Sequence, residues 1–159
     1  MKIDGRRVDS ILFVCLGNIC RSPAADAVMR KKAAERGLTI SVDSAGIGPW
    51  HVGQLPDSRM RRCGAKHGYN INHIARQVKA SDFELYDVIV GMDGENMAAL
   101  TRMAKQNGAD AGRIVCLADY LTESREYTTV PDPYYGDEED FEIALRLIEE
   151  AVDNLLSQE

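Results

Sequence analysis

The apolar residues of this chain fall into short continuous runs separated by longer segments of helical period. Residues 11–15 and 87–92 form two such runs, which are too short for ordinary helices and suit strands buried on both faces. Residues 39–45 alternate apolar and polar positions, and residues 113–117 are again short and apolar. The pattern therefore predicts four strands.

Segments with helical spacing connect these runs. The expected helices cover residues 23–36, 57–67 and 138–156, with another after Asp93 and a short one near Ser81. Strands that alternate with helices indicate a parallel sheet with right-handed crossovers. We therefore expect an α/β fold, a single three-layer α/β/α domain with a four-stranded parallel sheet over residues 10–159, preceded by a polar leader at residues 1–9.

The segment 10–23 has the most informative sequence, Ser-Ile-Leu-Phe-Val-Cys-Leu-Gly-Asn-Ile-Cys-Arg-Ser-Pro. Its strand ends at Cys15, and Ser22 followed by Pro23 favours a helix start, with Ser22 as the N-cap. A short glycine-containing loop between a strand and a helix N-terminus points successive backbone N–H groups inward, where the helix dipole adds positive potential. We expect residues 16–21 to form an anion site.

Three side chains make this anion site reactive. Cys15 would project from the strand end into the ring of N–H groups, which favours a thiolate, the nucleophilic form. Arg21 would return to the loop mouth, where its planar guanidinium can hold two phosphate oxygens, and the Ser22 hydroxyl can lie near the sulfur. This arrangement predicts transfer through a cysteinyl intermediate. The alternative is that Cys15 is a small buried residue.

Net charge, apolar runs and cysteine spacing disfavour nucleic-acid-binding, membrane and metal-binding proteins. The 159 residues carry a net charge of −6, which disfavours general nucleic-acid binding. No apolar run approaches the roughly 18 residues of a membrane span, and residues 1–9 lack the apolar stretch of a signal peptide. We expect a cytoplasmic enzyme without nucleic-acid or membrane partners. The four cysteines lack zinc-site spacing and the chain is too large to need disulfides, so we expect no metal and no cofactor.

Further motifs follow the loop in an order shared with one known family. They are Cys15 to Ser22, Asp43 to Gly46, Trp50 to Gly53, Asp57 to Met60, Met92-Asp93 and Asp132 to Gly136. On these motifs the chain resembles the low-molecular-weight protein tyrosine phosphatases over nearly its whole length. The resemblance implies hydrolysis of protein phosphotyrosine through a phosphocysteine. It also implies a strand order of second, first, third, fourth, with the phosphate loop after the first strand.

The resemblance gives roles to the catalytic residues. Cys15 is the expected nucleophile, Arg21 the phosphate clamp, and Asp132 the general acid and then the general base. From its position alone, Asp132 could equally be a turn aspartate between two prolines. The expected phosphate-binding residues are Leu16, Gly17, Asn18, Ile19, Cys20, Arg21 and Ser22.

The same resemblance implies supporting roles, each of which has ordinary packing or turn formation as its alternative. The residues expected to hold the loop by hydrogen bonds are Asn18, Ser22, Ser44 and His73. The residues expected to line the substrate slot are Ile19, Trp50, Tyr134 and Tyr135. Cys20 is the expected resolving thiol that would trap oxidised Cys15 as a disulfide, so that the enzyme is redox-regulated. The acidic run 137–142 either begins the last helix or borders the pocket.

Three other functions stay open. Family members that hydrolyse phosphoarginine tend to carry Thr where Ile19 stands and a non-tyrosine aromatic residue where Tyr134 stands. Arsenate reductases on this fold use a cysteine pair near the third strand, and residues 80–92 contain none. An inactive phosphotyrosine-binding module is the non-enzyme alternative. The partners that the resemblance implies are a phosphotyrosine-containing protein, such as a tyrosine kinase, and phosphate or sulfate in the site of a mostly monomeric protein.

Overall fold

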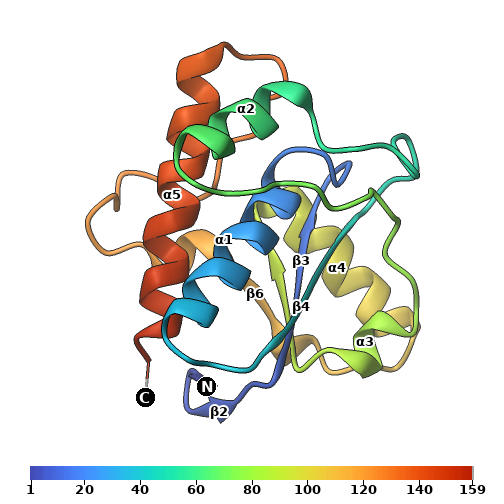
Figure 1. Cartoon of the computed structure of the whole chain (residues 1–159). Coiled ribbons are helices and arrows are strands. Elements are labelled where there is room, and N and C mark those ends of the chain that lie inside the picture. The colour runs from blue at the N-terminus through green and yellow to red at the C-terminus, as the bar shows by residue number, and fades with distance from the viewer. Residues whose placement is uncertain (159) are drawn as a thin grey trace.

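The centre of the molecule is a parallel sheet of four strands, seen in the computed structural model, which describes residues 1–158 (Figure 1). The strands are β3 (Ser10–Cys15), β4 (Ser41–Gly46), β5 (Val88–Gly91) and β6 (Ile114–Cys116). Their order is β4-β3-β5-β6 and every pair is parallel. This is the predicted order of second, first, third, fourth strand, so the strand that carries Cys15 lies in the interior of the sheet.

Helices cover both faces of this sheet. On one face, α1 (Arg21–Glu35) packs against β3, β4 and α5 (Glu138–Leu156), and α2 (Ser58–Lys66) packs on α5 (Figure 1). On the other face lie α4 (Gly94–Gln106) and the short α3 (Asp82–Leu85). Two 3-10 turns, Ala111–Arg113 and Leu117–Tyr120, flank β6. Within residues 1–158, none of these helices combines the length and the apolar character that crossing a bilayer requires.

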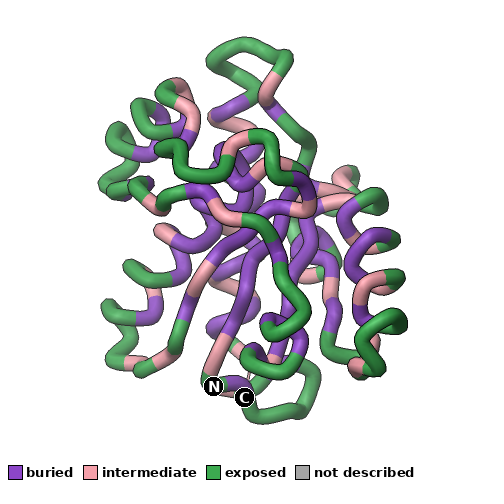
Figure 2. Tube along the Cα trace, turned by 90° about the vertical axis from the view of Figure 1, so that its right-hand side faces the viewer, coloured by how far each residue is buried: buried purple, intermediate pink, exposed green. Residues whose placement is uncertain are grey.

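The continuous apolar run of β3 follows from burial on both faces. Ile11 and Phe13 pack in the core shared with α1 and α5, whereas Leu12 and Val14 pack in the core shared with α4. All four side chains are completely buried, and Figure 2 shows the central strands as the buried interior of the molecule. A strand with two buried faces cannot alternate with polar residues, which is why it appears in the sequence as an unbroken run.

Aspartates begin three of the helices by accepting hydrogen bonds from the first turn. Asp57 accepts from the Arg59 N–H before α2, and Asp93 accepts from the Asn96 N–H before α4. Asp137 caps α5 in a capping box with Asp140. The predicted starts at residues 57, 93 and 138 therefore agree with the structure, and the acidic run 137–142 forms the first turn of α5.

The first nine residues are more structured than the predicted polar leader. β1 (Lys2–Ile3) and β2 (Arg6–Arg7) pair as an antiparallel hairpin whose turn residues, Asp4 and Gly5, both have positive φ. Ile3 and Val8 are only 2% and 1% exposed, and both belong to the core on the α1 and α5 face. The missed signal was Asp4-Gly5, the dipeptide that favours a two-residue hairpin turn.

Candidate active site

The loop at residues 16–20 joins the C-terminal end of β3 to the N-terminus of α1. The buried side chain of Asn18 holds this loop in its conformation by hydrogen bonds. With φ of 59°, Asn18 is one of the few non-glycine residues that tolerate this left-handed conformation. Its amide donates to the Ser22 Oγ at 2.8 Å and to the Ser44 Oγ at 3.0 Å, and its Oδ1 accepts from the Arg76 N–H at 3.0 Å. Asn18 therefore ties the loop to α1, to β4 and to the segment before α3.

The Cys15 sulfur and the Ser22 hydroxyl lie 3.0 Å apart, both in buried residues. The expected proximity of hydroxyl and sulfur is present, but Ser22 is not the N-cap of the helix. Helix α1 begins at Arg21, its N-cap is Cys20, and that cap has no side-chain hydrogen bond. Because the Ser22 hydroxyl interacts with Cys15 and Asn18 inside the site, it does not cap the helix.

Arg21 is 2% exposed and approaches the site from α1. Its Nη1 donates to the Asp93 Oδ2 at 2.7 Å and to the Val130 carbonyl at 2.9 Å. Burial opposes its charge, but Cys15 and Asp93 outweigh that effect and hold the pKa of Arg21 above its ordinary value. Its Nε has no hydrogen-bond partner among the described residues, so Nε and Nη2 are the donors left for a ligand.

Asp132 comes from the long loop before α5. Its Oδ2 lies 3.6 Å from the Arg21 Nη2, and its Oδ1 accepts from the Tyr134 N–H at 3.1 Å. The side chain is 39% exposed. Sequence reasoning placed Asp132 near the phosphate loop, and the structure brings the two together from positions more than a hundred residues apart.

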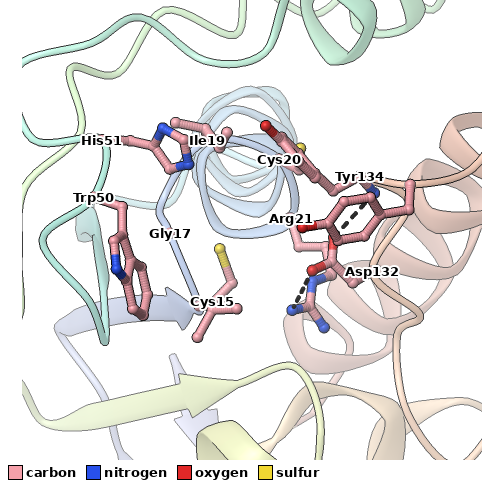
Figure 3. Close-up of a pocket in the computed structure, with 11 residues that line it drawn as sticks. Cys15, Gly17, Ile19, Cys20, Arg21, Trp50, His51, Asp132 and Tyr134 are labelled. Atoms are coloured by element: carbon pink, nitrogen blue, oxygen red, sulfur yellow. Dashed lines mark hydrogen bonds and ion pairs between the residues drawn. The ribbon is translucent and has the colours of Figure 1, made fainter.

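These groups share one pocket of about 330 Å³. Figure 3 shows the Cys15 sulfur pointing into it, between Trp50 and His51 on one side and Asp132 and Tyr134 on the other. The full lining is Cys15, Leu16, Gly17, Ile19, Cys20, Arg21, Trp50, His51, Asp132, Tyr134 and Tyr135. All four residues that the sequence predicted as substrate-lining are in this set.

The aromatic walls differ in how firmly they are held. The Tyr134 ring packs edge-on against the Tyr135 ring, with their centroids 4.9 Å apart. The Arg59 Cζ lies 5.6 Å from the centroid of the Tyr134 ring. Trp50 is 64% exposed and Tyr135 is 95% exposed. Gly48 leaves the space that the Trp50 ring occupies, because a Cβ at Gly48 would overlap that ring. Tyr134 is therefore packed against its neighbours, whereas Trp50 and Tyr135 are largely exposed to solvent.

The family model of low molecular weight phosphotyrosine protein phosphatases matches residues 10–159. The chain belongs to this family. Such a phosphatase of Gallus gallus is 43% identical over 137 residues, 85% of each chain. A protein tyrosine phosphatase of Entamoeba histolytica, solved with Hepes in its active site, has a TM-score of 0.87 at 43% identity, covering 92% of this chain and 94% of that one. The structure of a Drosophila arginine phosphatase has a TM-score of 0.86 at 34% identity, with the same two coverages.

Of the described residues expected to support the loop in this phosphatase-family chain, Ser44 contacts it and His73 does not. Ser44 contacts Asn18 directly. Within residues 1–158, His73 makes no hydrogen bond or ion pair with the loop, and its Nδ1 lies 3.4 Å from the Asp43 Oδ1 and 3.7 Å from the Asp26 Oδ2. Because Asp43 also accepts from the Ser44 N–H, His73 reaches the loop only through that strand.

The four cysteines of this phosphatase-family chain are free and buried. Cys20 lines the pocket beside the catalytic candidate Cys15. Burial, and then the charges of Asp57 and Cys15, raise the pKa of the Cys20 thiol. Burial thus favours the neutral thiol of Cys20 over its thiolate, and Cys20 makes no disulfide in this structure.

Sequence reasoning missed three residues of the phosphatase site. Asp93 was expected only as a helix cap, yet it also pairs with Arg21. Arg76 supports Asn18 through its backbone, while its guanidinium bonds Asp43 and Asp82. His51 lines the pocket at 6.2 Å from the Tyr134 ring. For Asp93 the available signal was its position two residues after the end of β5, at the edge where parallel sheets bind ligands.

Proposed function

We propose that this chain hydrolyses phosphotyrosine in proteins through a phosphocysteine intermediate on Cys15. Membership of the phosphatase family supports the reaction class, since relatives at about 40% identity carry that name. The observation that carries the mechanism is the convergence of the Cys15 sulfur, the free donors of Arg21 and the Asp132 carboxylate on one pocket.

In the first step, the Cys15 thiolate attacks phosphorus in line and the bond to the tyrosyl oxygen breaks. The backbone N–H groups of residues 16–21 and the Nε and Nη2 of Arg21 stabilise the charge on the equatorial oxygens. Asp132, in its protonated form, gives its proton to the departing phenoxide. The Ser22 hydroxyl, 3.0 Å from the sulfur, donates a hydrogen bond that stabilises the thiolate.

In the second step, water attacks the phosphocysteine and the sulfur–phosphorus bond breaks. Asp132, now ionised, accepts the proton of that water, which regenerates the acid for the next turnover. Phosphate leaves and Cys15 returns as a thiolate. The chain's own donors supply all the charge stabilisation in this scheme, and it contains no step that requires a cofactor.

Three aromatic side chains and Ile19 would form the slot for the substrate ring. Tyr134 and Trp50 lie on opposite sides of the Cys15 sulfur (Figure 3), and aromatic walls favour a flat phenyl ring between them. Tyr135 and Ile19 complete the apolar rim. In this proposal Asn18, Ser22 and Ser44 keep the loop in its ligand-binding shape, and His73 acts at one remove through Asp43.

Cys20 is the candidate resolving thiol for an oxidised Cys15. A sulfenic acid on Cys15 would be attacked by the Cys20 sulfur, releasing water and forming a reversible disulfide. Mass spectrometry after brief peroxide treatment tests this step, because the Cys15–Cys20 bond should form in the native protein and be absent from Cys20→Ser.

Two variants test the proposed reaction. Cys15→Ser should abolish phosphate release from phosphotyrosine, whereas Cys116→Ser, a buried cysteine outside the pocket, should retain it. Asp132→Asn should slow phosphotyrosine turnover by about 10²- to 10⁴-fold, and p-nitrophenyl phosphate less, because nitrophenolate needs little protonation to leave. Turnover by Cys15→Ser, or an equal effect of Asp132→Asn on both substrates, contradicts the mechanism.

Phosphoarginine hydrolysis is the second candidate, because the chain resembles an arginine phosphatase at a TM-score of 0.86. The same loop could serve either substrate, so the slot must discriminate between them. We expect phosphotyrosine to be preferred, since a slot lined by Trp50, Tyr134 and Ile19 matches a flat ring. Comparing kcat/KM on phosphotyrosine and phosphoarginine peptides tests this preference, and a higher value on phosphoarginine would reverse the assignment.

A further inference from the structure

A second cluster of chemically active side chains lies away from the pocket, between α2 and α5. It consists of Cys63 and His67 from α2 and its C-terminal cap and Glu142 from α5, and we call it the α2–α5 cluster. The Cys63 sulfur, one imidazole nitrogen of His67 and one carboxylate oxygen of Glu142 lie within 4.8 Å of one another. The His67 Nε2 and the Glu142 Oε2 are 2.7 Å apart. None of the three residues lines the pocket that contains Cys15.

The donor set is one that zinc prefers. Zn²⁺ takes thiolate, imidazole and carboxylate ligands at about 2.0–2.3 Å in tetrahedral geometry. Bound donor atoms are then about 3–4 Å apart, so the three atoms here need only small side-chain movements to reach a common ion. The spacing of four residues between Cys63 and His67 puts both on one side of α2, facing α5.

We propose that the α2–α5 cluster binds a divalent ion of the Zn²⁺ type through Cys63, His67 and Glu142, with water in the fourth position. Among the cations near the cluster, Lys66 is paired with Glu138, whose carboxylate lies 2.5 Å from the Lys66 Nζ. Two arginines, Arg59 and Arg62, line the pocket beside Cys63. The ion joins two helices whose contributing residues are about 75 positions apart in the chain.

Burial of the cluster favours a stable site with an accessible entrance. Cys63 is 3% exposed, which anchors one ligand in the core, while the side chains of His67 and Glu142 are 42% and 36% exposed. Cys63 also lines a surface pocket with Arg59, Arg62, Glu138 and Phe141.

Binding has a defined proton balance. Burial and then Glu142 raise the pKa of the Cys63 thiol to about 12, so the free protein holds the thiol protonated. The ion displaces that proton to solvent as the sulfur–metal bond forms. His67 binds as neutral imidazole, and its contact with Glu142 is replaced by bonds from both residues to the ion. The thiol proton of Cys63 is therefore released as the ion binds.

The experiment uses Zn²⁺ and the full chain carrying Cys15→Ser and Cys20→Ser, so that the pocket thiols do not compete. We expect one Zn²⁺ per chain by isothermal titration calorimetry and a rise in Tm on adding Zn²⁺. Co²⁺ should give a sulfur-to-metal charge-transfer band, which reports a cysteine ligand. In this background, His67→Asn and Cys63→Ser should each weaken Zn²⁺ binding at least about tenfold.

Cys116→Ser in the same background is the matched control, because Cys116 is also buried but lies in β6. It should leave Zn²⁺ affinity and the cobalt band unchanged. If Cys63→Ser does not fold, the half-exposed His67→Asn variant carries the test. The proposal is overturned by no binding at about 100 μM Zn²⁺, by full affinity in His67→Asn, or by equal loss in Cys116→Ser.

Discussion

At the scale of single residues, the guanidinium of Arg21 is held through one nitrogen, which leaves the other two nitrogens able to bind a ligand. One nitrogen, Nη1, is fully used by Asp93 and the Val130 carbonyl. The other edge, Nε and Nη2, faces the pocket with only Asp132 nearby, at 3.6 Å from Nη2. Because Nε and Nη2 lie on one edge of a planar group, they can donate to two oxygens of the same phosphate. Asp93 thus orients Arg21, the proposed phosphate clamp, and does not itself line the pocket.

Asp93→Asn should therefore lower kcat/KM without unfolding the protein. Asparagine has one carbonyl oxygen, so it cannot both cap α4 through the Asn96 N–H and accept from Arg21 as Asp93 does. A guanidinium displaced by about 1 Å would cost about 10- to 100-fold in kcat/KM. Steady-state kinetics on a phosphotyrosine peptide measures the loss.

Asp110→Asn is the matched control for this change. Asp110 also caps a short helical turn, by accepting from the Gly112 N–H, but it lies outside the pocket. We expect its kinetics to match the unmodified chain. Full activity in Asp93→Asn would show that Arg21 is positioned by the Val130 carbonyl and its own packing instead.

At the scale of elements, the phosphate loop lies directly against the end of β4. A Cβ built on Gly46 would be 3.0 Å from the Gly17 carbonyl carbon and 3.1 Å from the Asn18 nitrogen. These are backbone atoms, which cannot rotate away as a side chain can. The absence of a side chain at Gly46 therefore lets strand and loop approach this closely.

Gly46→Ala should disturb both stability and turnover. Forcing a methyl group into this contact is expected to cost about 1–3 kcal/mol in the free energy of unfolding, and the shifted loop should lower kcat. Urea unfolding and steady-state kinetics measure the two effects. Gly94→Ala, at a helix position where a Cβ would meet nothing within 4 Å, should keep kcat unchanged and should raise stability slightly, if at all. Normal kcat in Gly46→Ala would mean that the loop tolerates displacement.

The helix cap at the start of α2 makes stability depend on pH. A hydrogen bond from Arg59 holds the pKa of the Asp57 carboxyl below its ordinary value of 3.8. A carboxyl whose pKa is lowered by folding stabilises the protein fully above that ordinary value, and the stabilisation is lost as the pH falls through the folded-state pKa. Ionised Asp57 therefore contributes at neutral pH and not in strong acid.

Asp57→Asn should flatten the acid side of the stability profile. Asparagine can keep the helix cap but has no charge to pair with Arg59, whose side chain is 38% exposed, so the lost contribution should be under about 1 kcal/mol. Urea midpoints at about pH 6 and about pH 3 should show a smaller difference for Asp57→Asn than for the unmodified chain. An unchanged difference would remove Asp57 from the groups responsible for acid sensitivity.

At the scale of the whole molecule, local sequence signals predicted the fold class and the loop with Cys15, Arg21 and Ser22, whereas most residues that line the rest of the pocket followed from the family resemblance. The buried run before Cys15, the aspartates at 57, 93 and 137, and the alternation of strands with helices each act over a few residues. Burial of β3 on both faces and the starts of α2, α4 and α5 followed from those signals. The strand order and the nearness of Asp132 to the loop followed from the family resemblance.

Contacts between distant segments could not be predicted in the same way. Asp93 pairs with Arg21 across 72 positions, and the Arg76 N–H reaches Asn18 across 58. Neither pair has a spacing or composition that distinguishes it from many other charged or polar residues. Their partners are decided by how β5 and the segment before α3 lie against the loop, which is a property of the assembled sheet.

Substitutions of buried residues in the hairpin at residues 1–9 should change the stability of the whole molecule without changing its activity. Figure 1 shows this hairpin at the opposite end of the molecule from the loop that follows β3. Ile3→Ala should lower the free energy of unfolding by about 2–5 kcal/mol, because Ile3 is 2% exposed and its truncation leaves a cavity in the core. Lys2→Ala, an exposed neighbour on the same strand, should change it by less than about 0.5 kcal/mol. Both variants should keep the kcat of the unmodified chain at a temperature where all are folded. A reduced kcat in Ile3→Ala would instead mean that the core beneath α1 transmits strain from the hairpin to Arg21.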